Sequence, residues 1–315
     1  MKRLFSVLAF LPLLLLPFSS TSGILAEAPK EPVYRIIHSR TGKELTLAQL
    51  ADELSARDLV YFGELHDNVA GHRVYAELAK LLVEKRPDFV LSMEMFERDV
   101  QGVVNDFLRG RLDEAAFLKL SRPWKNYAQD YKPLVDLARD KKADLIAGNL
   151  PKAVASKVAS KEGSSSPYLP RTTTTPNDRY WELFGDAMKG HPGPEGAAER
   201  MYRAQCAKDD AMAEAIADYL GANPHRQPLV IHCNGNFHSD YGLGTAARVA
   251  QRSPLCQAAI ISMVAVPDVA KADVTADRKK GHYLLVVTAP PKPPTPAKPP
   301  EKTGEKKSVD AKPKT

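Results

Sequence analysis

Apolar positions along the chain alternate between short continuous runs and longer stretches with helical spacing. The continuous runs are typical of buried strands, and they lie at residues 59–62, 89–93, 144–147, 228–232, 259–265 and 283–288. Apolar side chains recur three and four positions apart in residues 70–85, 100–109, 114–120, 131–141 and 195–220, which predicts helices. Strands alternating with helices predict an α/β fold with a mainly parallel β-sheet, flanked by helices on both faces.

We expect a single large domain over residues 33–289, preceded by a signal peptide at residues 1–28. Two basic residues open the chain, an apolar run follows from 4 to 18, and residues 26–28 read Ala-Glu-Ala, like a small-x-small cleavage site. An uncleaved anchor is the alternative, but the run is short and interrupted by two prolines. No cysteine lies in this segment, so we expect an exported protein, periplasmic or secreted, without a lipid anchor.

Composition changes again at residues 160–176 and 290–315. The first is rich in Ser, Thr and Pro and predicts a flexible surface insert. The second is almost entirely Pro, Lys, Thr, Glu and Ala, which predicts a disordered tail. This tail carries seven Lys against two Glu and one Asp, so most of the net charge of +6 lies outside the domain. The charge therefore does not indicate a nucleic-acid partner, although the tail could contact a membrane or cell wall.

Three cysteines, Cys206, Cys233 and Cys256, are the whole complement of the chain. Their spacing is not a zinc signature. In an exported protein one pair could form a disulfide and leave one thiol free, and the sequence does not say which pair.

Polar side chains gather at the points where the predicted strands end. Because the carboxyl ends of parallel strands border the ligand crevice of such a sheet, residues from distant parts of the sequence should meet there. Those that follow the strands at 59–62, 89–93, 144–147 and 228–232 are Glu64, His66, Glu94, Asn149, Asn234 and His238.

Two G-x-x-H stretches, Gly63–His66 and Gly235–His238, directly follow predicted strands. Glycine permits a sharp turn there, and the histidine three residues later can face back over the strand end. His66, His238 and Glu94 would form a two-histidine, one-carboxylate set that suits a divalent metal. Without metal the same residues could act as general base and acid.

Simpler interpretations apply to several neighbours. His72 lies in the first turn of a predicted helix and is expected to pack there, and His232, inside a strand, is expected to be a core histidine. Trp124 and Tyr127 could line a planar ligand, but core packing is the simpler role.

The motifs YFGELHDN, LSMEMFERDVQ, DYKPLVDLAR, LIAGNLP, YRAQCAKDDAMA and VIHCNGNFHSDYGLGTAARV occur in this order, over roughly Val33 to Thr288. Together they resemble the ChaN-like haem-binding uptake family, within the Tiki, TraB and erythromycin-esterase-like superfamily. The resemblance implies an exported protein that binds haem and assists haem or iron acquisition. It also implies an alternative, because Tiki-like relatives are metal-dependent proteases with paired G-x-x-H motifs, and esterase-like relatives are hydrolases with a catalytic His and Glu.

Matched position by position, the polar centre of the superfamily falls on Glu64, His66, Glu94 and His238, the candidate catalytic residues. Asn149, Gln205 and Asp209 match further positions typical of the family, and with Asn234 they are the candidate cofactor-binding residues. Haem is the implied cofactor and partner; a divalent metal ion and a homodimer are left open.

The sequence departs from the family at Phe237, where relatives often have glycine, and in lacking a lipidation cysteine. The family's haem ligand is a tyrosine outside the G-x-x-H motifs, and Tyr127, Tyr131, Tyr168 and Tyr180 are the candidates. A haem carrier and a His/Glu-dependent or metal-dependent hydrolase therefore remain the two hypotheses. No C-x-x-C-H motif is present, which excludes covalent attachment of the c type.

Overall fold

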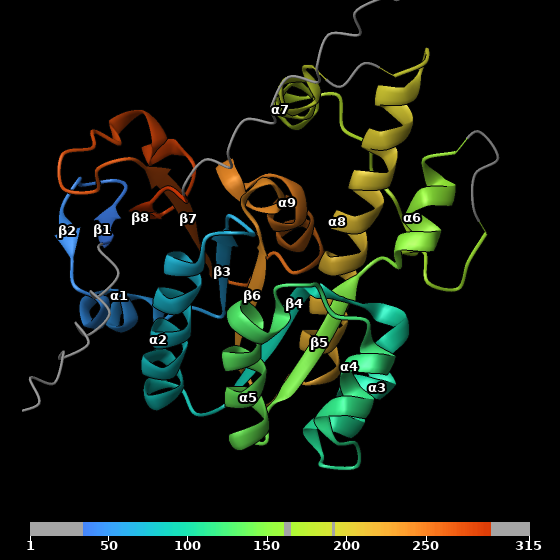
Figure 1. Ribbon diagram of the computed structural model, residues 1–315, viewed down its shortest axis with the longest axis horizontal. Helices are drawn as coiled ribbons and strands as arrows, with labels where there is room; N and C mark the ends of the chain where they lie inside the picture. The colour runs from blue at the N-terminus through green and yellow to red at the C-terminus, as the bar shows by residue number, and fades with distance from the viewer. Residues whose placement is uncertain (1–33, 161–164, 191–192, 291–315) are drawn as a thin grey trace, which may run out of the picture. The chain divides into compact units, whose positions relative to one another are not determined.

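A computed structural model describes residues 34–160, 165–190 and 193–290. The predicted signal peptide and the tail beyond residue 290 lie outside these residues. The described chain contains one eight-stranded sheet in the order β2-β1-β8-β7-β3-β6-β4-β5 (Figure 1). Its strands are β1 (Tyr34–His38), β2 (Glu44–Leu45), β3 (Leu59–Glu64), β4 (Phe89–Glu97), β5 (Asp144–Asn149), β6 (Leu229–Gly235), β7 (Ala258–Val266) and β8 (Tyr283–Thr288).

The six strands from β8 to β5 are mutually parallel, which confirms the predicted α/β class with a mainly parallel sheet. An antiparallel pair, β1 and β2, extends the sheet beside β8. The sequence pattern did not predict this edge, because its strands are short and only partly buried. All described residues belong to one compact unit.

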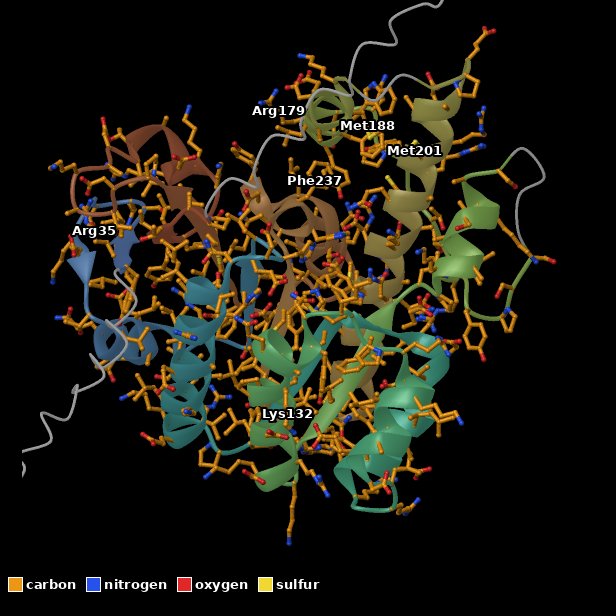
Figure 2. All side chains as sticks on the ribbon, viewed as in Figure 1. Arg35, Lys132, Arg179, Met188, Met201 and Phe237 are labelled. Carbon is orange, nitrogen blue, oxygen red and sulfur yellow. The ribbon has the colours of Figure 1, made fainter. Side chains whose placement is uncertain are left out.

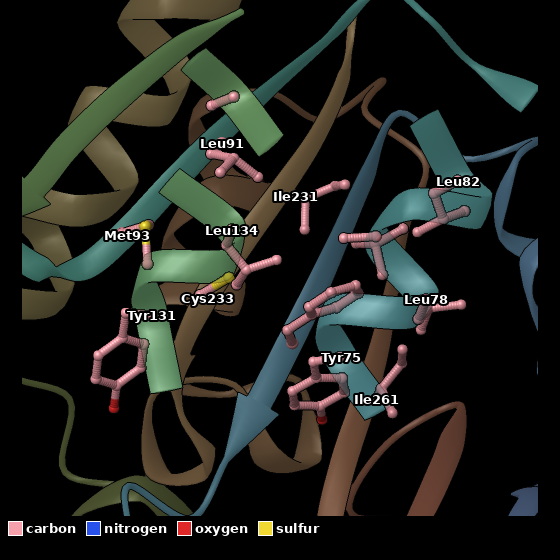
Figure 3. Packing of buried hydrophobic residues seen from close by; sticks show 14 of the residues in the cluster. Tyr75, Leu78, Leu82, Leu91, Met93, Tyr131, Leu134, Ile231, Cys233 and Ile261 are labelled. Carbon is pink, nitrogen blue, oxygen red and sulfur yellow. The ribbon is translucent and has the colours of Figure 1, made fainter. Parts of the chain in front are cut away.

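The helices cover both faces of the sheet. Val60 and Phe62 of β3 pack with α1, α2 and α5 in one hydrophobic cluster, whereas Leu59 and Tyr61 pack with α8 and α9 in another. This alternation is what a strand buried on both faces requires. Figure 3 shows part of the first cluster, which includes Tyr75, Leu78 and Ile231. The helices are α1 (Leu47–Leu54), α2 (Val69–Lys85), α3 (Gln101–Leu108), α4 (Glu114–Ser121), α5 (Lys132–Asp140), α6 (Lys152–Val158), α7 (Arg179–Met188), α8 (Ala197–Ala222) and α9 (Gly244–Arg252).

Helices α1, α6, α7 and α9 were not predicted from the apolar spacing. Three of them have an identifiable local cause. Thr46 forms a capping box with Gln49 at the start of α1, and Asp178 caps α7. The third, α6, begins directly after Pro151, which is a favourable residue at a helix start.

The described part of the predicted insert, residues 165–176, contains no helix or strand. Its backbone is nevertheless hydrogen-bonded to α8, since Asp210 accepts from the amide of Thr174 at 2.8 Å and Glu214 accepts from that of Arg171 at 2.8 Å. Asp210 is fully buried and also accepts from the Arg248 guanidinium at 3.0 Å. These contacts hold residues 171–174 against α8.

The three cysteines are all free, so the structure contains none of the disulfide pairings that the sequence left open. They pack in different places: Cys233 lies in the cluster with α2, Cys256 packs beside α9, and Cys206 lies under α7. Within the described residues, no helix is long and apolar enough to cross a membrane.

Candidate functional site

Two buried carboxylates, Glu64 and Glu94, lie at the carboxyl ends of β3 and β4, on either side of β6. Strand alternation sends them to opposite faces of the sheet. Glu64 follows Phe62 in the alternation and contacts residues of α2, whereas Glu94 contacts His238, which in turn contacts α8. Each helical layer therefore supplies its own partners to one carboxylate.

Glu64 accepts three hydrogen bonds. The donors are the Tyr131 hydroxyl at 2.7 Å and the imidazoles of His66, through Nδ1 at 2.8 Å, and His72, through Nε2 at 2.9 Å. Burial raises the pKa of the Glu64 carboxyl, but the hydrogen bonds from His66 and His72 outweigh it and hold this pKa below its ordinary value. On the far side, His72 Nδ1 lies 3.4 Å from the Asp130 carboxylate.

His66 is the member of this group that faces solvent, with 46% of its side chain exposed. Burial lowers the pKa of the imidazole, but the hydrogen bond to Glu64 and the charges of Glu94 and Glu64 raise it above the ordinary value. Trp124 packs edge-on against the ring, with centroids 4.8 Å apart. His66 is thus oriented through Nδ1 and directs the rest of its ring outward.

His238 lies between two carboxylates. Its Nδ1 is 2.7 Å from Asp209 and its Nε2 is 3.3 Å from Glu94. Burial disfavours the imidazolium, but the charges of Glu94 and Asp209 outweigh it and raise the pKa of His238 to about 10. In turn, His238 and the Gly235 amide, which donates to Glu94 at 2.8 Å, hold the pKa of Glu94 well below its usual range.

Asp209 is fully buried at the end of this second group. It also accepts from the hydroxyls of Tyr180 at 2.6 Å and Thr245 at 2.9 Å. Gln205, one turn earlier on α8, has its amide nitrogen 3.3 Å from the His238 ring. The charge of the imidazolium is therefore compensated on both sides within the protein.

Gly235 separates the two groups. A Cβ placed on it would lie 2.7 Å from the His66 ring and 3.6 Å from the Glu94 carboxylate. No real side chain fits at that distance unless a neighbour moves. The absence of a side chain at Gly235 therefore allows His66 to lie over the end of β6, beside Glu94.

A cavity of about 1340 Å³ opens above these groups. Glu64, His66, Glu94 and His238 lie at its base, together with Asn149 and Gln205. Its apolar wall comes from α6, α7 and α8, and Figure 2 shows Met188, Met201 and Phe237 grouped near α7 and the adjoining part of α8. Phe237 packs on Tyr180, with ring centroids 4.8 Å apart, and so links α7 to the turn that carries His238.

The other predicted site residues occupy different places. Asp209 and Asn234 are fully buried and do not line the cavity; Asn234 donates to the Gly235 carbonyl and to Ser239. Among the residues that the structure describes, no group of three His, Cys, Asp or Glu side chains is arranged to hold a metal ion. His66, Glu94 and His238 line the cavity and make this part of its surface polar. The two imidazoles are already paired with carboxylates.

Sequence reasoning missed several residues of the two groups. His72 was expected to pack in its helix, and it is buried there. Its hydrogen bond to Glu64 was not anticipated. Asp130 lies in a π-helical turn before α5 and was not singled out. Tyr131, in the same turn, was named only as a candidate haem ligand and not as a partner of Glu64. Tyr241, also missed, lines the cavity, is 39% exposed and has a left-handed backbone with φ of 63°.

Comparison with known proteins finds a family that the chain matches. A family model described as haem-binding uptake, Tiki superfamily, ChaN, matches residues 50–249. The solved structure of ChaN of Campylobacter jejuni with cofacial haem is similar in fold, with a TM-score of 0.63 and 16% identity over 81% of this chain and 97% of that chain.

Two further solved structures are similar at lower scores. An erythromycin esterase variant in its open conformation has a TM-score of 0.46 and 11% identity, over 81% of this chain and 83% of its own. The type III effector HopBA1 has a TM-score of 0.46 and 12% identity, over 83% of this chain and 99% of its own. No curated protein sequence matches the chain.

Substitution Gly235→Ala is expected to displace the His66 ring, because the new methyl group would overlap it. Since the ring is half exposed and can rotate outward, the free energy of unfolding should fall by only roughly 1–3 kcal/mol. The displaced imidazole should lose its bond to Glu64, and its pKa, followed by NMR, should drop. Gly148→Ala, at the end of β5, is the control, because its Cβ would meet Met212 at an ordinary 3.5 Å. An unchanged His66 titration in Gly235→Ala would contradict the assigned contact.

The charge states of the buried His232 and His238 predict that the free energy of unfolding is highest over an intermediate range of pH. Because the folded pKa of His238 is raised to about 10, its stabilisation is complete below its unfolded value and is lost as pH rises through about 10. Burial lowers the pKa of His232 to about 4, so its contribution is lost as pH falls toward that value. Unfolding in urea should therefore show falling stability at both extremes. Nitrogen NMR at pH 7 should find His238 doubly protonated and His232 neutral; a neutral His238 would contradict the interpretation.

Proposed function

Because the chain belongs to the haem-binding uptake family of the Tiki superfamily, ChaN, we propose that it binds haem in the cavity above Glu94 and His238. The observation that carries the proposal is the cavity itself. At about 1340 Å³ it exceeds the roughly 300–1,000 Å³ of ordinary ligand pockets, and one wall is apolar. A flat macrocycle needs such a wall, an axial ligand and cations for its carboxylates.

Tyr241 is the residue that best fits the role of axial ligand. Of the four tyrosines expected as candidates, Tyr127, Tyr131 and Tyr180 are buried, and Tyr168 faces a different cavity beside β5. Tyr241 is exposed in the main cavity, and its left-handed backbone fixes the turn that presents it.

Two cations lie within electrostatic range of the Tyr241 phenol. Arg179 on α7 and Lys280 before β8 both interact with it. A tyrosine oxygen serves as the axial ligand of haem iron in some haem proteins. When bound, the iron would supply Lewis acidity and redox chemistry, and the chain would hold and orient the ring.

We further propose that the protein is exported and assists haem or iron acquisition. The support is the family membership together with the signal-like composition of residues 1–28. The basic tail would remain available for contact with an anionic surface. The proposed location outside the cytoplasm rests on export of the chain and not on any feature of the cavity.

A haem titration followed by absorbance tests the proposal. The protein from residue 29 to 290 should show saturable binding with a shifted Soret band. Tyr241→Phe should change the spectrum and weaken binding by roughly tenfold, about 1.4 kcal/mol. Tyr168→Phe is the matched control, because Tyr168 is equally exposed at 39% but lies outside the cavity. His66→Ala and His238→Ala should not remove the Soret shift. Absence of saturable binding would end the haem proposal.

A second candidate function is acid–base hydrolysis in the same cavity. The observation that favours it is the pair of imidazoles held in different states. His66 is half exposed with Nδ1 bound to Glu64, whereas His238 is buried as an imidazolium between Glu94 and Asp209. Groups with separated pKa values at one site are typical of paired base and acid roles. His66 would take a proton from water, and His238 would stabilise developing negative charge.

This second function predicts a pH dependence that a haem carrier would not show. In a screen of chromogenic esters and peptides, activity should rise with pH as His66 loses its proton, and His66→Ala should lower it roughly 100-fold. Glu64→Gln removes the carboxylate that raises the pKa of His66, so the rising limb should move to lower pH. Equal rates in wild type and His66→Ala would exclude the hydrolytic role.

A further inference from the structure

Two lysines in the cavity wall have no anionic partner among the residues that the structure describes. Lys152 opens α6 and Lys208 lies on α8, and both line the cavity. Within the described residues neither side chain makes an ion pair, in contrast to Lys280, which bonds to Asp277 at 2.7 Å. Helix α6 and the preceding Leu150 pack against α8, through Ala155 on α6 and Ala207 and Ala211 on α8. The two ammonium groups therefore belong to one wall of the cavity.

The polar base of the cavity offers no comparable free charge. His238 has Asp209 and Glu94 on its two ring nitrogens, and His66 has Glu64 on Nδ1. Glu94 also accepts the Gly235 amide. An anion that enters the cavity would find the imidazolium already neutralised by carboxylates, and would find its unpaired cations at Lys152 and Lys208.

Apolar side chains continue from the lysine wall toward α7. Leu183, Phe184, Ala187 and Met188 line the cavity from α7, and Ala204 lines it from α8. Helix α7 is held against α8 by aromatic contacts, including that of Trp181 on α7 with Tyr202 on α8, whose ring centroids are 4.9 Å apart. The cavity thus joins a fixed apolar surface to a cationic edge, which matches a flat apolar ring with carboxylates along one side.

From this arrangement we propose that the cavity recognises a dicarboxylic tetrapyrrole through its ring face and its carboxylates, with Lys152 and Lys208 as the carboxylate-binding residues, and that the central iron is not required. This inference rests on the proposed haem-binding function and specifies its ligand class. Iron coordination at Tyr241 would add to the free energy of binding. Burial of the ring and pairing of its carboxylates would supply most of that free energy. Metal-free protoporphyrin should therefore be a ligand.

The test compares haem with metal-free protoporphyrin on the protein from residue 29 to 290, by absorbance and by porphyrin fluorescence. We expect the metal-free ring to bind within about 30-fold of haem, a difference of about 2 kcal/mol. Its dimethyl ester, which lacks the two negative charges, should bind at least about tenfold more weakly than the free acid. Haem binding without protoporphyrin binding would overturn the inference and leave the proposed function intact. Failure of both ligands would instead refute the proposed function.

Variants of the chain test the two lysines separately. The double variant Lys152→Ala/Lys208→Ala should weaken protoporphyrin binding about tenfold or more, and should narrow the difference between the acid and its dimethyl ester. Lys119→Ala, an exposed lysine on α4 outside the cavity, is the control for general loss of charge. The double variant should also bind with less dependence on salt, because fewer charges are paired on binding. An unchanged acid-to-ester ratio in the double variant would show that these lysines do not hold the carboxylates.

Discussion

Burial of two carboxylates at the carboxyl edge of the sheet is the constraint around which the rest of the site is arranged. Glu64 and Glu94 are 3% and 5% exposed, and a buried carboxylate is costly unless cationic or donor groups compensate it. The chain meets this requirement twice, with His66, His72 and Tyr131 around Glu64 and with His238 and the Gly235 amide around Glu94. Removing one partner would leave a buried carboxylate less well compensated, so each carboxylate depends on the groups that surround it.

Helix α8 brings this constraint and the cavity wall together. Asp209 orients His238, while the adjacent Asp210 binds Arg248 and the backbone at Thr174. Lys208, which directly precedes Asp209, lines the cavity. Consecutive side chains on one helix point in different directions, so three neighbouring residues serve the polar base, the anchoring of the 165–176 loop and the ligand wall. The long helix thus couples the position of the wall to the charge of His238.

The same arrangement permits two kinds of chemistry. A haem would contact the upper wall through apolar side chains, lysines and Tyr241, whereas proton transfer would use His66 at the base. The two uses need different residues of one cavity. Family membership favours the first, and the geometry of the imidazoles is the reason to consider the second.

The α/β class, the main strands and the residues at their carboxyl ends could be predicted from the order of amino acids. This is so because buried strands are continuous apolar runs, and the chain direction fixes which residues follow them. Glu64, His66, Glu94 and His238 could be found in this way. The partners His72, Asp130 and Tyr180 could not, since a helical or loop position looks the same whether its side chain packs or hydrogen-bonds a buried carboxylate.

The division of these residues into two groups, and the side chains that surround each group, depend on how the chain folds in three dimensions. Strand alternation places the two carboxylates on opposite faces, and helix packing then selects the partner of each. Gly235 lies next to His66 only because β6 runs between β3 and β4, an order that local sequence does not encode. The cavity wall likewise depends on α7, which was not predicted and is held by aromatic contacts with α8 and Phe237. Contacts between segments distant in sequence have no periodic signal, so they emerge only when packing and hydrogen bonding bring those segments together.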